Sequence, residues 1–276
     1  MYLNKKLVIT AVLFIFQFSL WNDNGYCQGI EVYPSRLFFH SASNNSEIQV
    51  IHITNKGKST LILNTYLKDW LRDSTGNKVY YPPTTLPHSN ASWITTTPSQ
   101  LSIDPGKSKE LTVQLKALNN SQPFTNAMLF LSQINQQDTI YKNDENGRKV
   151  GLIFKVEVGI HIYNTTPSVN PTKKLKFISL KETTVSTDSL RHFETTIKNE
   201  GEDATDATIR FNLTETTTGQ KYPLTDRKIS MFPGAIQIIQ FNFPKSLPKG
   251  NYQIIVIGDA GDNSTLQIAK KQITYE

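Results

Sequence analysis

Apolar and polar side chains alternate with a period of two over short stretches of this chain, and turn residues separate the stretches. In "KELTVQLKAL" the apolar residues Leu111, Val113 and Leu115 share one parity, which places them on one face of a strand. Turn clusters such as "NKGKS", "DSTGN" and "DPGKS" punctuate short strand-like runs, a pattern typical of β-sandwiches. The pattern predicts an all-β protein whose first half holds about seven strands, as in an immunoglobulin-like sandwich.

The longest alternating stretch is "GLIFKVEVGIHIY", residues 151–163. Its apolar side chains share one parity, which predicts a single strand about twice the usual length of roughly 5–6 residues. Such a strand can bury the core of its own domain, or it can offer an edge to another chain. Those side chains are Leu152, Phe154, Val156, Val158, Ile160 and Ile162.

A second β pattern follows a segment rich in proline and small polar residues, "PSVNPTK", at 167–173. Proline cannot donate to a sheet ladder, so this segment is predicted to be an extended linker. Beyond it, Ile209, Phe211 and Leu213 alternate with polar residues, and turns such as "FPGA" punctuate the pattern. The chain is therefore expected to hold two immunoglobulin-like β-sandwich domains in tandem, residues 28–166 and 174–276.

Residues 1–27 have the pattern of a secretory signal peptide. Lys5 and Lys6 form a basic start, and an uncharged apolar run at 7–20 is shorter than the ~20 residues that span a bilayer. Cleavage is expected near Cys27 and Gln28, which predicts a periplasmic protein, with an extracellular or cell-surface location as the alternative. A lipid anchor on Cys27 is less favoured because "NGYC" lacks the usual apolar and small residues. Cleavage would also remove the only cysteine, and with it any disulfide.

Charge and motifs exclude several classes of function. The net charge is +6 and the pI is near 9.2, but the basic residues are scattered and no basic block with interleaved aromatics occurs. Nucleic-acid binding is therefore not expected. The five histidines are dispersed, without metal-binding spacing, and no nucleophile elbow or phosphate loop is present. The prediction is a protein that is not an enzyme and has no catalytic residue, metal or cofactor.

Three further patterns in the sequence suggest chemistry, but ordinary structural roles are the favoured interpretation. Asp69 and Asp73 form a potential carboxylate pair, but solvated acids near a strand end are the favoured interpretation. The "DAGDN" loop at 259–263 lacks the oxygen ligands of a calcium loop. Trp70, Trp93 and the tyrosines at 80–81 suggest a carbohydrate-binding module, but aromatic residues more often pack in cores.

The order of landmarks in the first domain resembles the N-terminal domain of periplasmic pilus chaperones, the PapD-like family. The landmarks are "YPSRLFF" with Arg36, "IQVIHITNKGKSTLIL", "WITTTPSQLSIDPGKSKELTVQL", "AMLFLSQI" and "GIHIYNTTP". The resemblance covers about residues 29–168 and is much weaker over the second domain.

The resemblance implies a chaperone that lends the last strand of its first domain to an incomplete subunit, a form of β-augmentation. By position, Leu152, Phe154, Val156 and Val158 would bind the partner strand, although they can equally fill this domain's own core. Arg36 would hold the subunit's terminal carboxylate, or else be a surface arginine on an edge strand. His161 stands where the family has a lysine, and a neutral histidine would weaken a two-cation anchor.

The expected partners are exported, pilin-like β-rich subunits and an outer-membrane usher, without nucleic acid or a membrane span after cleavage. An unpaired apolar edge would also allow a self-capping dimer. The rival hypothesis is a structural or adhesive cell-envelope binding protein of the same fold.

Overall fold

The computed structural model describes residues 29–42, 44–118, 122–135, 140–143, 145–152, 155–166, 172–183, 189–261 and 264–276. The predicted signal peptide, Phe154 and most of the predicted linker lie outside the described residues. No helix in the described part of the chain is long and apolar enough to cross a membrane.

Two sheets face each other in the first domain. One has the strand order β1 (Ile30–Tyr33), β3 (Ser46–Asn55), β8 (Ser108–Lys116) and β6 (Ile94–Thr97). The other has the order β2 (Arg36–Phe39), β12 (Glu157–Thr165), β9 (Phe124–Gln133), β4 (Leu61–Arg72) and β5 (Lys78–Tyr81), with β7 (Gln100–Ile103) also paired to β4. A short 3-10 helix, Ala91–Trp93, precedes β6. The alternating side chains Leu111, Val113 and Leu115 are all fully buried in the core between the sheets, as their pattern predicts.

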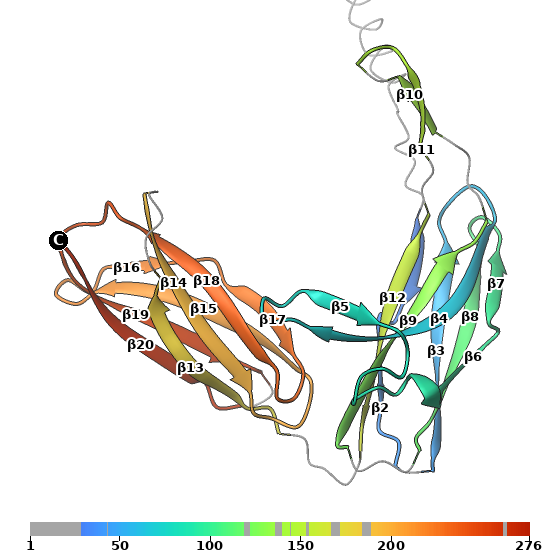
Figure 1. Ribbon diagram of the computed structural model, residues 1–276, viewed down its shortest axis with the longest axis horizontal. Coiled ribbons are helices and arrows are strands. Elements are labelled where there is room, and N and C mark those ends of the chain that lie inside the picture. The colour runs from blue at the N-terminus through green and yellow to red at the C-terminus, as the bar shows by residue number, and fades with distance from the viewer. Residues whose placement is uncertain are drawn as a thin grey trace, which may run out of the picture.

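The predicted long strand at 151–163 is not continuous, so that prediction is wrong. Residues 149–152 form β11 (Lys149–Leu152), which pairs with β10 (Ile140–Asn143) in a separate two-stranded sheet. Figure 1 shows this hairpin extending beyond the end of the first sandwich. The pairing of β11 with β10 separates it from β12. The periodicity within 151–163 could not predict this, because it carries no information about a partner strand outside that stretch.

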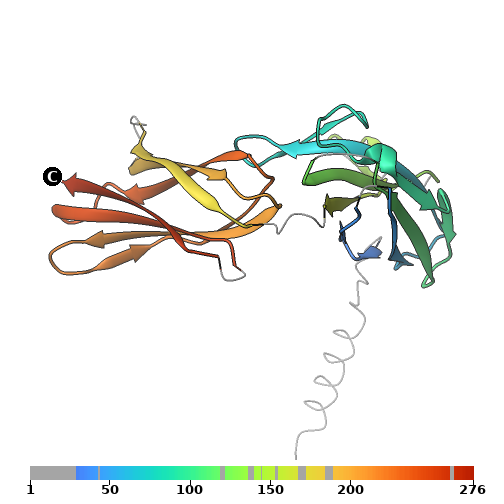
Figure 2. The ribbon, with the colours of Figure 1, turned by 90° about the horizontal axis from the view of Figure 1, so that it is seen from below.

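The second domain is also a sandwich. One sheet joins β13 (Leu175–Glu182), β14 (Leu190–Asn199) and β18 (Ile236–Pro244). The other joins β16 (Lys221–Pro223), β15 (Thr205–Glu215), β19 (Gly250–Asp259) and β20 (Gln267–Tyr275), and β17 (Arg227–Met231) pairs with β15. Ile209, Phe211 and Leu213 are buried in its core. The structure thus confirms an all-β fold of two tandem sandwiches (Figure 2), and Figure 1 shows the second sandwich set at an angle to the first.

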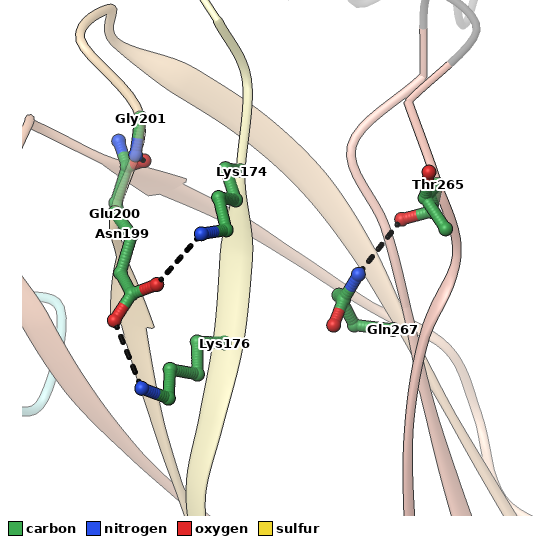
Figure 3. A network of polar contacts seen from close by, with 7 residues as sticks. All are labelled: Lys174, Lys176, Asn199, Glu200, Gly201, Thr265 and Gln267. Carbon is green, nitrogen blue, oxygen red and sulfur yellow. Dashed lines mark hydrogen bonds and ion pairs between the residues drawn. The ribbon is translucent and has the colours of Figure 1, made fainter.

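The entry to the second domain is held by backbone and ionic contacts. Glu200 accepts ion pairs from the Nζ atoms of Lys174 and Lys176, each at 3.2 Å (Figure 3). The backbone of Thr172 and Lys174 runs so close to Gly201 that a Cβ there would lie 2.1 Å from the Thr172 carbonyl oxygen. Only glycine fits this approach, which fixes where the chain enters the second sandwich.

Candidate functional site

Strand β12 has one edge that is only partly covered. Over its whole length it pairs antiparallel with β9, and from His161 to Asn164 its other edge pairs parallel with β2. Within the described residues, no strand pairs with that second edge from Glu157 to Ile160. The His161 amide donates to the Ser35 carbonyl on the β2 side at 3.1 Å. Because amides alternate along a strand, those of Glu157 and Gly159 face the uncovered part of the same edge.

The side chains of β12 separate by parity onto two surfaces. Ile160 and Ile162 are fully buried in the first domain's core, and Val158 is partly buried against the same core. The position of Val158 is therefore the one expected if its side chain fills the core of its own domain. Val156 is half-buried, and its amide donates to the Gln133 side chain at 3.2 Å. The Leu152 backbone pairs with Ile140, and neither its side chain nor Phe154 is among the described groups.

The opposite parity of β12 faces the second domain. His161 and Tyr163 lie on this face, and Arg36 pairs with His161 across the strands β2 and β12. The two predicted anchor residues are therefore direct neighbours. Arg36 Nη1 donates to Asp206 Oδ2 at 2.5 Å, so a carboxylate of the second domain already contacts the predicted carboxylate anchor.

Asp206 shows that this location stabilises a carboxylate. Burial acts to raise its pKa, but hydrogen bonds from Ser230 and Arg36 and the positive charges of Arg36 and Arg72 lower it below the usual 3.8. The carboxyl is therefore ionised at neutral pH, held by donors from both domains.

His161 is uncharged at neutral pH. Burial, together with the nearby charges of Lys78 and Arg36, lowers its pKa to about 4. Its ring lies 4.8 Å from the ring of Trp70 and stacks on Tyr163 at 5.9 Å. Both imidazole nitrogens are buried, and neither has a hydrogen-bond partner within the described part of the chain. As an anchor for a carboxylate, His161 can donate a hydrogen bond but supplies no positive charge.

An aromatic cluster joins the two domains beside this site. It contains Trp70, Phe124 and Tyr163 of the first domain, and Phe232 of the second packs against it. The ring of Phe232 lies 4.7 Å from that of Trp70 in an edge-on arrangement. Trp70 is 1% exposed, so it offers no face for stacking on a sugar, as the carbohydrate-binding hypothesis would require.

A cleft of about 910 Å³ opens between the domains next to the Arg36–Asp206 pair. The turn between β4 and β5 forms part of its wall, and the Ile238 amide of the second domain donates to the Ser74 carbonyl of that turn at 2.7 Å. The lining is predominantly basic. Its charged residues are Arg36, Arg72, Lys173, Arg227 and Lys228, against Asp206 and Asp259.

The two other acids considered from the sequence have structural roles. Asp69 is 1% exposed, so its predicted solvation is wrong. Its carboxylate accepts hydrogen bonds from the amides of Thr85 and Leu86, each at 2.7 Å, and from the Ser89 hydroxyl. Asp73 is the acid that matches the expectation, because it caps its own turn through Thr75 and Asn77 at the surface. Among the described residues, no group of three or more His, Cys, Asp or Glu side chains is placed to hold a metal.

Neither protein-family models nor curated proteins match this chain. Solved structures match over most of its length. A chaperone–tip adhesin complex of CFA/I fimbriae biogenesis is 12% identical, with a TM-score of 0.46, covering 87% of this chain and 97% of that one. The E. coli chaperone DraB is 13% identical, with a TM-score of 0.42, covering 87% and 97%.

A complex of the Salmonella enterica SafA pilin with the SafB chaperone is 12% identical, with a TM-score of 0.45, covering 88% of this chain and 96% of that one. Each of these three structures contains a chaperone. At identities of 12–13%, the function of this chain has to be inferred from its own contacts.

Proposed function

We propose that this chain is a chaperone for exported β-rich subunits and binds them by β-augmentation along residues 157–160 of β12. One observation carries the proposal: the edge of β12 is uncovered from Glu157 to Ile160 and is closed by β2 from His161 onward. The described residues thus leave space along this edge for a strand of about four residues, which ends at Arg36.

The direction of a bound strand follows from β2. Because β2 runs parallel to β12 and begins at Arg36, a client strand parallel to β12 would occupy the same edge immediately before β2. Its C-terminal carboxylate would then meet the start of β2, beside the Arg36 guanidinium. Recognition of a strand with a free C-terminus requires unpaired backbone groups along an edge and a cation at the end of that edge. The edge of β12 and Arg36 provide both.

The affinity would come from main-chain hydrogen bonds and apolar side chains. Each new hydrogen bond contributes about 0.5–1.5 kcal/mol net. Leu152, Phe154 and Val156 are the side chains proposed to fill the client's groove, with Val158 continuing them into this domain's own core. Each buried apolar side chain adds roughly 1.5–3 kcal/mol before ordering costs.

The proposal includes the cellular setting expected from the sequence. A signal peptide cleaved near Cys27 would deliver the protein to the periplasm, where pilin-like subunits are the clients and an outer-membrane usher receives them. Several of the matched structures are named as chaperones in complex with a pilin or a tip adhesin.

The test uses the Glu157 amide, which faces the uncovered edge. Glu157→Pro removes this donor at the first residue of β12, where proline is tolerated, while Glu157→Ala keeps the donor and removes only the side chain. The protein is co-expressed with a tagged, exported β-rich subunit of the pilin type, and the complex is quantified by pull-down. Glu157→Pro should reduce the complex at least tenfold, and Glu157→Ala should leave it near the wild-type level.

Phe154→Asp tests the proposed groove-filling side chain. It should abolish capture while the sandwich keeps its thermal transition. Capture that survives both Glu157→Pro and Phe154→Asp would refute strand donation. Unfolding by Phe154→Asp would instead assign that side chain to this domain's own core.

A further inference from the structure

The β4–β5 hairpin brings two cations to the side of the anchor where His161 supplies none. Arg72 and Lys78 are cross-strand partners in this hairpin. The Arg72 Cζ and Lys78 Nζ atoms each lie 5.7 Å from the centre of the Trp70 ring, and the His161 ring packs on that same indole at 4.8 Å. Both cations and the His161 ring are therefore grouped around the indole of Trp70.

These cations lack an acidic partner in the described part of the chain. Asp206 pairs with Arg36, and Asp259 at the far side of the cleft pairs with Arg210. Among the described residues, no carboxylate lies within ion-pair distance of Arg72 or Lys78, and the hydrogen bond found for the Arg72 side chain goes to the Gly76 carbonyl at 2.8 Å. Arg72 Nε and Trp70 Nε1 are both buried and have no hydrogen-bond partner among the residues that the structure describes. Buried donors of this kind are normally paired, so the group around Trp70 is suited to a ligand that only accepts hydrogen bonds.

We propose that Lys78 and Arg72 of the β4–β5 hairpin, in place of His161, provide the positive charge that complements Arg36 in the carboxylate anchor. This role rests on the proposed function. The ligand class is the C-terminal carboxylate of an extended peptide. Arg36 binds it from β2, and the hairpin cations bind it from β4 and β5 of the same sheet. A carboxylate with cations on two sides is fixed in position more strongly than one held by a single guanidinium.

The position of the hairpin supports this role. The backbone hydrogen bond from Ile238 to Ser74 ties the turn to the second domain, and the Gln237 side chain packs against Gly76 in the same turn. The turn of the hairpin that carries these cations is thus held by two contacts with the second domain. Such support reduces the ordering cost of binding.

The experiment compares two fluorescein-labelled peptides of alternating Val and Thr that differ only at the C-terminus, one a free carboxylate and the other an amide. Affinities of the full chain are measured by fluorescence polarisation. Lys78→Met should weaken binding of the carboxylate peptide about three- to tenfold and leave the amide peptide unchanged. Lys78→Arg should restore the carboxylate preference, and Arg72→Met should act in the same direction as Lys78→Met.

Lys68→Met is the matched control. Lys68 is another cation of β4, but its Nζ lies 5.4 Å from the Phe130 ring and 5.5 Å from the Tyr66 ring, outside the group around Trp70. It should change neither affinity. A wild-type preference for the carboxylate that Arg36→Ala removes, but that Lys78→Met and Arg72→Met leave intact, would overturn the hairpin proposal and retain Arg36 as the anchor.

Two other outcomes act on the proposed function. Equal binding of the two peptides by the wild-type protein would overturn the whole carboxylate anchor, hairpin included. Absence of binding by either peptide would overturn recognition along the edge of β12, and the hairpin proposal with it.

Discussion

Removing the phenyl ring of Phe232 should uncouple the two domains without unfolding either. Phe232 lies in the loop between β17 and β18, where Gly234 adopts a positive φ of 74° and its amide donates to the Asn199 carbonyl. This turn presents the ring to the first domain, where it meets the rings of Trp70 at 4.7 Å, Phe124 at 5.5 Å and Tyr163 at 6.1 Å.

The size of the effect follows from these three contacts. Aromatic pairs contribute about 0.5–1.5 kcal/mol each beyond area burial, and truncating a fully buried Phe costs about 3–5 kcal/mol. Because Phe232 is only partly buried, we expect Phe232→Ala to weaken the contact between the domains by about 2–3 kcal/mol. The remaining contacts, chiefly the Arg36–Asp206 pair and the Ile238–Ser74 hydrogen bond, are few and partly exposed.

The assay measures the distance between dyes placed on exposed positions of each domain, through Lys109→Cys and Lys270→Cys in a protein starting at Gln28. Phe232→Ala should broaden the single-molecule FRET distribution and split one urea transition into two. Phe38→Ala is the control, because its ring contacts Tyr163 at 5.3 Å from within the first domain. A Phe232→Ala protein with an unchanged distribution and a single transition would show that the aromatic cluster does not hold the domains together.

Three further predictions concern single side chains. Asp69→Ala leaves the amide of Thr85 without its partner in a buried site, and should lower the free energy of urea unfolding by about 3 kcal/mol; a loss below about 1 kcal/mol would contradict this role. Gly201→Ala places a methyl group on the Thr172 carbonyl, and should lower the thermal midpoint of the second domain by several degrees in calorimetry; an unchanged midpoint would show that the backbone yields without cost. His161 has a pKa of about 4 in the folded chain against 6.5 ordinarily, so the unfolded chain binds protons more readily between these values, and stability is lost as the pH falls from 6.5 to about 4. His161→Gln should flatten this part of the stability–pH curve, and an unchanged slope would assign it to other groups.

Periodicity and turn chemistry were enough to predict the two sandwiches. The core residues of β8 and β15 alternate because each strand has one buried face, so local sequence carries the signal. Arg36 and His161, chosen from the sequence through the order of landmarks, are register partners across β2 and β12. Their role as a carboxylate anchor stays a prediction.

The rest depends on contacts between residues far apart in the chain. The break between β11 and β12 reflects pairing with β10, which the pattern of 151–163 does not encode. The local sequence predicts that Asp69 is solvated, but a loop sixteen to twenty residues later folds over its carboxylate and donates hydrogen bonds to it. Likewise, "FPGA" indicates a turn, but nothing in it indicates that Phe232 meets Trp70 of the other domain.

The β4–β5 hairpin belongs to the first domain by sequence but is held partly by the second, through the hydrogen bond between Ser74 and Ile238. Arg36 also belongs to the first domain, but its carboxylate partner, Asp206, belongs to the second. The two domains are therefore not interchangeable modules. A chimaera that joined this first domain to the second domain of another protein would keep the edge of β12, but it would inherit a hairpin without its support and an arginine without its counter-ion. Exchange of domains among proteins of this architecture would have to preserve both contacts together.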